Sequence, residues 1–153
     1  MKTTLCLIAA LTVTAAAAAD KPDFSGEWKL NIAKSVFGIV PPPTSMTRKV
    51  THAEPSLTIA DDQKGGTGDQ SSSRAYTTDG KEITYQVNGA SVKGAATWDG
   101  DALSIRSHAD VGGMTISIVE KMALSSGNKI LTVAVHIATA QGDIDVTYIF
   151  DKQ

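Results

Sequence analysis

Hydrophobic and polar residues alternate along most of this chain. After the three prolines at 41–43, apolar side chains recur at every second position in short segments, which is the period of a half-buried antiparallel strand. Helical spacing is nearly absent, so the pattern predicts an all-β fold. The strands are predicted at Gly26–Ile32, Ser45–His52, Ser56–Asp61, Gln70–Tyr76, Glu82–Val87, Ser91–Trp98, Ala102–Ser107, Met114–Leu124, Lys129–Ala138 and Ile144–Asp151.

Tight turns are predicted between many of these strands, because Gly, Asn and Asp tolerate the positive φ that such turns require. They fall at Thr78-Asp79-Gly80, Asn88-Gly89, Asp99-Gly100, Ser126-Gly127-Asn128 and Gln141-Gly142-Asp143. Consecutive hairpins that each bury one face must curl into a barrel or split into a sandwich, and sequential pairing favours the barrel. We expect a single antiparallel up-and-down barrel of about eight to ten strands. The segment Ala33–Val40 is expected to be a short helix or loop that closes one end.

Strand parity predicts which side chains point into the barrel, because alternate residues of a strand face opposite sides. The predicted inward set is Trp28, Leu30, Ile32, Leu57, Ile59, Ile83, Tyr85, Val87, Val92, Ala96, Trp98, Leu103, Ile105, Leu131, Val133, Val135, Ile137, Val146, Tyr148 and Phe150.

The first residues, Met1–Ala19, have the three-part pattern of a secretory signal peptide. A charge at Lys2 precedes an apolar stretch, Leu5–Val13, and small residues occupy 17–19, where a signal peptidase would cut. A membrane anchor is the alternative, but the apolar stretch is far shorter than the roughly 20 residues that a span needs. The expected mature domain is residues 20–153, without a membrane span.

Composition narrows the compartment and the partners. The chain has 14 basic and 16 acidic residues, and loss of Lys2 with the leader would leave 13 and 16, so no basic field recruits nucleic acid. The single cysteine, Cys6, lies inside the expected leader, which excludes thiol catalysis and disulfides in the mature domain. A small exported domain without disulfides fits the bacterial periplasm or the external medium.

The opening strand carries a resemblance to known barrels. Its Gly26-Glu27-Trp28 resembles the Gly-x-Trp strand of lipocalins and fatty-acid-binding proteins, the calycin barrels, in which glycine lets the strand bend and the indole plugs the barrel floor. The resemblance implies a lipocalin-like barrel, and on this basis we expect an apolar ligand in its interior. It also implies that a basic residue near the last strand covers the tryptophan, a position that Lys152 can fill.

The wider chain resembles small exported bacterial proteins without an assigned activity. The shared runs are Trp28 to Ser35, Asp79 to Lys81 and Trp98 to Leu103. This second resemblance implies only a lipocalin-like barrel. One departure concerns the Arg-x-Tyr pair with which fatty-acid-binding proteins hold a carboxylate on the last strand. Tyr148 matches the tyrosine, but Val146 stands where the arginine would be.

No motif of metal binding or catalysis is visible in the sequence. The histidines His52, His108 and His136 lack metal-ligand spacing, and Ser71–Ser73 lies outside any nucleophile elbow. The glycine-rich run 65–68 lacks the Lys-Ser/Thr of a phosphate loop and is expected to be a hairpin loop. We therefore expect no enzyme, no cofactor and no metal.

Polar residues that share parity with apolar ones are the candidate ligand contacts. Residues two positions apart on a strand face the same side, so an inward Val50 places Arg48 inward, and an inward Tyr76 places Arg74 inward. A buried arginine is costly unless it is paired, so these two side chains suggest a polar anchor inside a cavity. A bulge or register shift that turns both to solvent is the alternative. The expected ligand-binding residues are Arg48, His52, Arg74, Tyr76, Tyr85 and Tyr148.

Two functions are compatible with these observations. The first is an exported, monomeric binding protein whose barrel interior holds a small, largely apolar or amphipathic molecule. The second is a barrel with a packed interior that binds a periplasmic protein, as an inhibitor or an envelope accessory, through its arm Asp20–Phe24 and the loop Ala33–Pro43.

Overall fold

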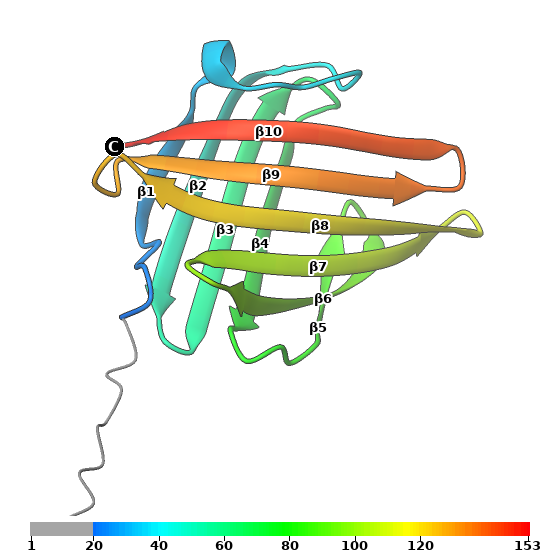
Figure 1. Ribbon diagram of the computed structural model, residues 1–153. Helices are drawn as coiled ribbons and strands as arrows, with labels where there is room; N and C mark the ends of the chain where they lie inside the picture. The colour runs from blue at the N-terminus through cyan, green and yellow to red at the C-terminus, as the bar shows by residue number, and fades with distance from the viewer. Residues whose placement is uncertain (1–19) are drawn as a thin grey trace, which may run out of the picture.

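The computed structural model describes residues 20–153, and the expected signal peptide, 1–19, lies outside these described residues. The chain forms one antiparallel sheet of ten strands that curls into a barrel, confirming the predicted fold class (Figure 1). The elements are β1 Gly26–Leu30, the 3₁₀ turn η1 Ile32–Lys34, β2 Pro43–Ala53, β3 Ser56–Gly65, β4 Gln70–Thr77, β5 Ile83–Val87, β6 Ala90–Asp99, β7 Ala102–Val111, β8 Met114–Ser125, β9 Ile130–Thr139 and β10 Gly142–Lys152.

All ten predicted strands are present, with ends that differ by a few residues. The first strand is shorter than expected because Asn31 caps η1, its Oδ1 accepting from the backbone N–H of Lys34 at 3.2 Å. Ile32 is therefore outside the strand and 38% exposed, so its predicted inward orientation is wrong. Beyond this cap, residues 31–42 continue beside β10, where Val36 pairs with Thr147 in an isolated antiparallel bridge.

The predicted hairpin turns are present, with one exception. Asn88 and Gly89 have φ of 49° and 81°, which joins β5 to β6 in a two-residue turn. Thr78–Gly80, in contrast, joins β4 to β5, and these two strands are not neighbours in the sheet. This segment instead bonds to other strands, with the N–H of Gly80 donating to the carbonyl of Ala96 at 2.9 Å. The predicted hairpin at this position is therefore wrong.

The sheet order explains how the barrel closes. It runs β4-β3-β2-β1-β10-β9-β8-β7-β6-β5, so β1 pairs with β10 while β4 and β5 form the two edges. Side chains fill the space between these edges. The rings of Tyr76 and Tyr85 meet edge to face with centroids 6.1 Å apart, and Asn88 Nδ2 donates to Gln70 Oε1 at 3.2 Å.

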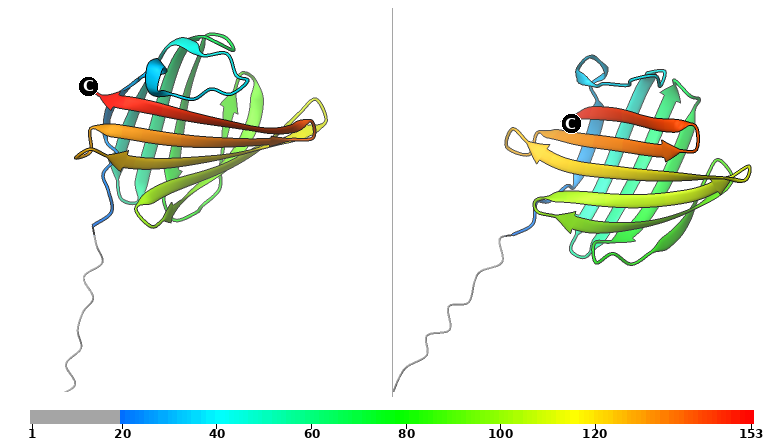
Figure 2. Two further views of the ribbon diagram at one scale, coloured as in Figure 1. Left: turned by 45° about the horizontal axis from the view of Figure 1, so that its top comes forward. Right: turned by 45° about the vertical axis from the view of Figure 1, so that its right-hand side comes forward.

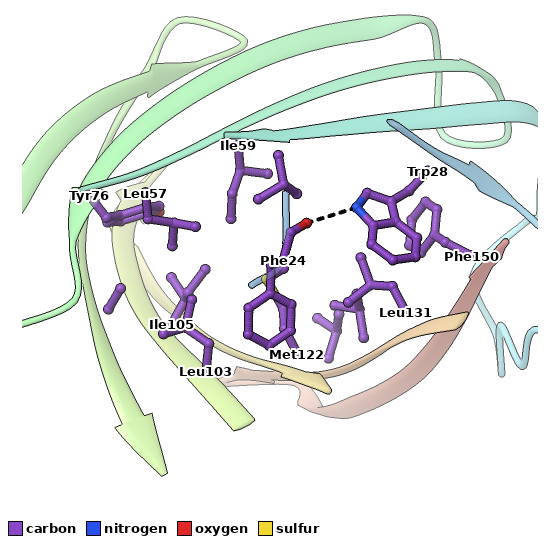
Figure 3. Close-up of a cluster of buried hydrophobic side chains, with 14 of the residues drawn as sticks. Phe24, Trp28, Leu57, Ile59, Tyr76, Leu103, Ile105, Met122, Leu131 and Phe150 are labelled. Atoms are coloured by element: carbon purple, nitrogen blue, oxygen red, sulfur yellow. Dashed lines mark hydrogen bonds between the residues drawn. The ribbon is translucent and has the colours of Figure 1, made fainter. Parts of the chain in front are cut away.

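The large, fully buried side chains gather around the start of β1, at the end of the barrel that we call the closed end, and Figure 3 shows how they pack together. Trp28 and Phe24 are fully buried there, and the indole Nε1 donates to the carbonyl of Phe24 at 3.1 Å. Lys152 covers the indole from 5.1 Å, as the Gly-x-Trp resemblance implied. The other large, fully buried side chains are Leu57, Ile59, Leu103, Ile105, Met122, Leu131, Val133 and Phe150. Each aliphatic side chain buried in this way contributes about 1.5–3 kcal/mol.

The opposite end, which we call the open end, carries the turns β3–β4, β5–β6, β7–β8 and β9–β10 (Figure 2). The segment 31–42 lies across part of this end. Phe37 from this segment packs edge to face on Tyr148, with ring centroids 5.9 Å apart, and the carbonyl of Pro41 lies beside Gly66. The predicted loop that partly closes one end is therefore present.

Candidate functional site

Four charged side chains meet inside the barrel. Arg48 on β2 donates from Nε and Nη2 to the two carboxylate oxygens of Asp61 on β3, at 2.6 and 2.8 Å. Arg74 on β4 donates to Asp61 Oδ2 at 2.8 Å and to Oε1 of Glu120 on β8 at 3.0 Å. These side chains are between 3% and 14% exposed. We call the four residues the charged layer.

The charged layer separates the apolar core from the open end. On β8, Glu120 stands between Met122, which is fully buried in the core, and Ile118, which lines a cavity toward the open end. The alternation of a strand makes this possible, because every second residue projects inward at a successive height along the barrel. The same alternation places Arg48 and Arg74 inside, so the alternative that turned both to solvent is excluded.

The charges of the layer stabilise one another. Burial by itself raises the pKa of Asp61 and Glu120, but the guanidinium groups of Arg48 and Arg74 outweigh it, and both carboxyl pKa values lie below their ordinary 3.8 and 4.5. Burial acts in the opposite direction on the two arginines, and the facing carboxylates again outweigh it, which raises both guanidinium pKa values. All four groups are therefore ionised at neutral pH.

Hydrogen bonding within this region is incomplete. Four buried polar atoms have no partner among the described residues, namely Arg48 Nη1, Arg74 Nε, Glu120 Oε2 and Tyr76 Oη. Arg48 Nη1 and Glu120 Oε2 lie 3.7 Å apart, which is too long for a direct hydrogen bond. Buried groups in this state retain capacity for further donors and acceptors.

A cavity of about 270 Å³ lies on the open-end side of the charged layer, which lines it. Uncharged polar side chains supply part of its wall, and these are Gln63, Gln70, Ser72, Tyr85, Ser107 and Tyr148. Apolar side chains supply the rest, and these are Met46, Val87, Val92, Ile118, Val135 and Ile137. Tyr85 donates its hydroxyl to Ser107 Oγ at 3.1 Å, which holds the phenol against β7.

A second, mostly apolar pocket of about 290 Å³ shares Val87, Val92 and Ile118 with this cavity. Val111 and Ile116 of the β7–β8 hairpin also line it, and we call it the apolar mouth. Val111 is 42% exposed, so the hairpin presents apolar surface to solvent at the open end. Together the two spaces run from a charged floor to an apolar opening.

The residues predicted as ligand contacts do not all meet in one place. Arg48, Arg74, Tyr85 and Tyr148 line the cavity. Tyr76 is 3% exposed and packs behind Tyr85 between the two edge strands, where burial raises the pKa of its phenol.

His52 lies apart from the cavity, at the closed end. Its Nδ1 accepts from the backbone N–H of Phe24 at 3.3 Å, and its Nε2 lies 2.8 Å from Glu54 Oε1. Glu54 also accepts from Trp98 Nε1 at 3.0 Å and from the hydroxyl of Thr78 at 2.6 Å. These contacts hold the N-terminal arm, residues 20–24, against the closed end of the barrel. His52 therefore has a structural role.

Sequence reasoning missed the acidic half of the charged layer. Asp61 shares parity with the buried Ile59, and Glu120 shares parity with Ile118 and Met122. The signal was therefore present as an acidic residue at an inward position on each strand. Only the pairing with an arginine from another strand makes such a position stable.

Within residues 20–153, no group of three or more His, Cys, Asp or Glu side chains is arranged to hold a metal ion. In the same part of the chain, no helix has the length and apolarity required to cross a membrane.

Comparison with known proteins places the fold. No family model and no curated protein sequence matches this chain. Among solved structures, zebrafish ileal bile acid-binding protein complexed with cholic acid is similar with a TM-score of 0.62 and 16% identity, covering 85% of this chain and 98% of its own. A secretory abundant heat soluble protein from Ramazzottius varieornatus is similar with a TM-score of 0.63 and 14% identity, covering 84% of this chain and 94% of its own. Human cRBP IV is similar with a TM-score of 0.58 and 13% identity, covering 86% of this chain and 99% of its own.

These similarities cover most of this chain and nearly all of each neighbour, so they concern the whole barrel. The identities are low, and the likeness is one of fold. The ten-stranded antiparallel meander, with β1 paired to β10 and a gap between β4 and β5, agrees with it. This chain has the fold of the calycin barrels, the group of fatty-acid-binding and lipocalin-like proteins.

Proposed function

We propose that this chain is an exported protein that binds a small, largely apolar or amphipathic molecule inside its barrel. The observation that carries the proposal is the cavity of about 270 Å³, which has a charged floor and shares three apolar lining residues with the apolar mouth. Ligand sites are typically concave, mostly apolar and equipped with a few polar groups that orient the ligand. The neighbour with bound cholic acid shows that a barrel of this fold holds an amphipathic molecule.

Each part of the cavity has a role in this proposal. The apolar wall, including Val92 and Ile137, removes the hydrocarbon part of the ligand from water. Tyr85 and Tyr148 offer rings with a polar tip, which suits the contact between the two halves of an amphiphile. Arg48 and Arg74 contribute through the charged layer, so the role proposed for them is to shape the floor. The function is binding, without a catalytic step.

Displacement of a fluorescent probe tests this function. Nile red titrated into the mature protein is expected to gain fluorescence and to be displaced by membrane lipids or their alkyl components. Ile118→Trp fills the cavity and is expected to abolish the gain, whereas Ser117→Trp, an exposed neighbour on β8, leaves it unchanged. Val87→Trp is a second blocking variant on an edge strand, in case Ile118→Trp does not fold. A probe signal that survives in both blocking variants contradicts the proposal.

Export is the second part of the proposal, and it is supported by the pattern of Met1–Ala19. Expressed with this segment in a bacterium, the protein is expected in the periplasm or medium with a new N-terminus at Asp20. N-terminal sequencing of each fraction tests this. A full-length chain that stays in the cytoplasm contradicts it.

A protein-binding role remains a second candidate, and one observation favours it. In the segment 31–42, Val36 and Ile39 are 62% and 83% exposed. The arm Asp20–Phe24 is less suited to docking, because Phe24 is fully buried in the closed end. Crosslinking in periplasmic extract is expected to capture a defined partner that Val36→Asp/Ile39→Asp loses. An unchanged set of crosslinks contradicts this role.

A further inference from the structure

The charge balance of the cavity floor carries an inference about the chemical class of the ligand, which rests on the proposed function. The floor combines two guanidinium groups with two carboxylates, so its formal charges cancel. We propose that the ligand enters this cavity with an uncharged polar end, such as a hydroxyl or an amide, and that a carboxylate is disfavoured.

The hydrogen-bond geometry of the arginines supports this choice. Carboxylates are recognised best by two parallel N–H groups of one guanidinium. The pair Nε and Nη2 of Arg48 is already occupied by both oxygens of Asp61. Both Nη atoms of Arg74 are also occupied, one by Asp61 and one by Glu120. The donor atoms left without a partner, Arg48 Nη1 and Arg74 Nε, belong to different residues, so a fork on either guanidinium must use the second N–H of its Nη2, which already donates to Asp61.

Electrostatics act in the same direction. A carboxylate that enters the cavity loses its hydration, and the floor carries no net positive charge to offset this loss, because Asp61 and Glu120 neutralise Arg48 and Arg74. An uncharged group loses less hydration and needs no counter-charge.

Uncharged hydrogen-bonding groups fit the cavity wall. Tyr85 uses its hydroxyl proton on Ser107 Oγ, which leaves the proton of Ser107 free to donate and the phenol oxygen free to accept. Glu120 Oε2 is an acceptor without a partner. A hydroxyl or a primary amide can both donate and accept, whereas a carboxylate only accepts. The wall therefore suits a group with both capacities.

The gradient of polarity orients the ligand. The charged layer forms the floor, and the apolar mouth around Val111 and Ile116 lies at the open end. An amphiphile then binds with its polar end inside and its hydrocarbon tail toward the mouth. Each of the two volumes, about 270 and 290 Å³, lies just below the roughly 300–1,000 Å³ that is usual for ligand sites, which suits a compact ligand.

Matched ligands test the inference with the unmodified mature protein. Decanol, decanamide, methyl decanoate and decanoate have hydrocarbon chains of nearly equal length and differ in the polar end. Calorimetric titration at neutral pH is expected to give at least tenfold tighter binding for decanol and decanamide than for decanoate. Methyl decanoate, which is uncharged but cannot donate, is expected between them. Binding of decanoate that equals or exceeds that of decanol overturns the inference and leaves the proposed function intact. A protein that binds none of the four, and no Nile red, contradicts the proposed function itself.

A charge variant extends the test. Glu120→Gln keeps the shape of the side chain and leaves the floor with one net positive charge, so the preference is expected to shift at least tenfold toward decanoate. Glu82→Gln removes the same charge from an exposed side chain of the barrel surface and is expected to leave the preference unchanged. Circular dichroism checks that each variant is folded. An equal shift in both variants, or none in a folded Glu120→Gln, contradicts the role of the charged layer.

Discussion

Arg74 and Glu120 join opposite walls of the barrel through a hydrogen-bonded ion pair of 3.0 Å between Nη1 and Oε1. Their strands, β4 and β8, are not neighbours in the sheet, so the bond crosses the interior. Both side chains are largely buried, at 8% and 14% exposed. Breaking one side of such a pair is costly, because the remaining charge is left buried without a counter-charge.

A double-mutant cycle tests this pair. Glu120→Leu alone is expected to lower the free energy of unfolding by about 3–5 kcal/mol, because two buried guanidinium groups then share the single carboxylate of Asp61. Arg74→Met/Glu120→Leu leaves the bidentate pair of Arg48 and Asp61 neutral and is expected to recover most of the loss. Urea unfolding followed by tryptophan fluorescence measures both. If the double variant loses as much free energy of unfolding as Arg74→Met and Glu120→Leu lose together, the two residues are not coupled.

An exposed ion pair serves as the control for this cycle. Lys49 and Glu27 approach to 3.5 Å with side chains 66% and 68% exposed. Glu27→Gln is expected to change the free energy of unfolding by less than about 1 kcal/mol, because water screens the pair.

Stability is expected to fall in acid. The pKa values of Asp61 and Glu120 are lower in the folded state than their ordinary 3.8 and 4.5, because Arg48 and Arg74 outweigh the effect of burial. Their contribution is therefore fully present above the ordinary values and is lost as pH falls through the lower folded ones. We expect the free energy of unfolding to decline below roughly pH 5. Other carboxyls contribute to this decline, so the comparison is with Arg74→Met/Glu120→Leu, in which the slope is expected to be shallower. Equal slopes contradict the assignment.

Gly94 on β6 provides room for the tyrosine between the edge strands. A Cβ at this position would lie 2.7 Å from Ser107 Oγ and 3.3 Å from the ring and hydroxyl of Tyr76. Gly94→Ala is therefore expected to lower the free energy of unfolding by about 1–3 kcal/mol through overpacking. Ser107→Ala in the same chain removes the nearest atom and is expected to restore part of the loss in urea unfolding. Gly94→Ala with the stability of the parent protein refutes the steric argument.

His136 is expected to titrate above its ordinary pKa of 6.5. A hydrogen bond of 2.8 Å from its Nδ1 to Asp145 is the main cause, and the charges of Asp145 and Asp143 add to it. NMR titration of the imidazole measures this pKa. Asp145→Asn is expected to return it toward 6.5, and Asp143→Asn to change it less. Because the pKa of His136 is raised in the folded state, its protonated form stabilises the fold below pH 6.5. This contribution is lost as pH rises through the folded pKa, and it is small because solvent screens the exposed pair.

The local sequence pattern was sufficient to locate the strands, because the inward-facing side chains of a strand recur at every second residue. That regularity located all ten strands and made inward positions for Arg48 and Arg74 one of two alternatives, which the burial of both side chains decides. It was not sufficient at Ile32, where the Asn31 cap ends β1 after Leu30. It also misplaced a hairpin at Thr78–Gly80, because turn residues do not reveal whether the strands on either side pair.

The sequence by itself therefore determined the class of fold and the succession of strands, both of which depend on neighbours within a few residues. Tertiary structure alone decided that Arg48 and Arg74 point inward and which carboxylates they meet. Glu120 is 46 positions from Arg74 and reaches it only because the sheet curls and brings β8 opposite β4. His52 shares β2 with Arg48 but lies beside the β2–β3 turn at the closed end, so its height along the strand keeps it away from the cavity. Contacts across a barrel depend on its closure and register, which no local pattern encodes.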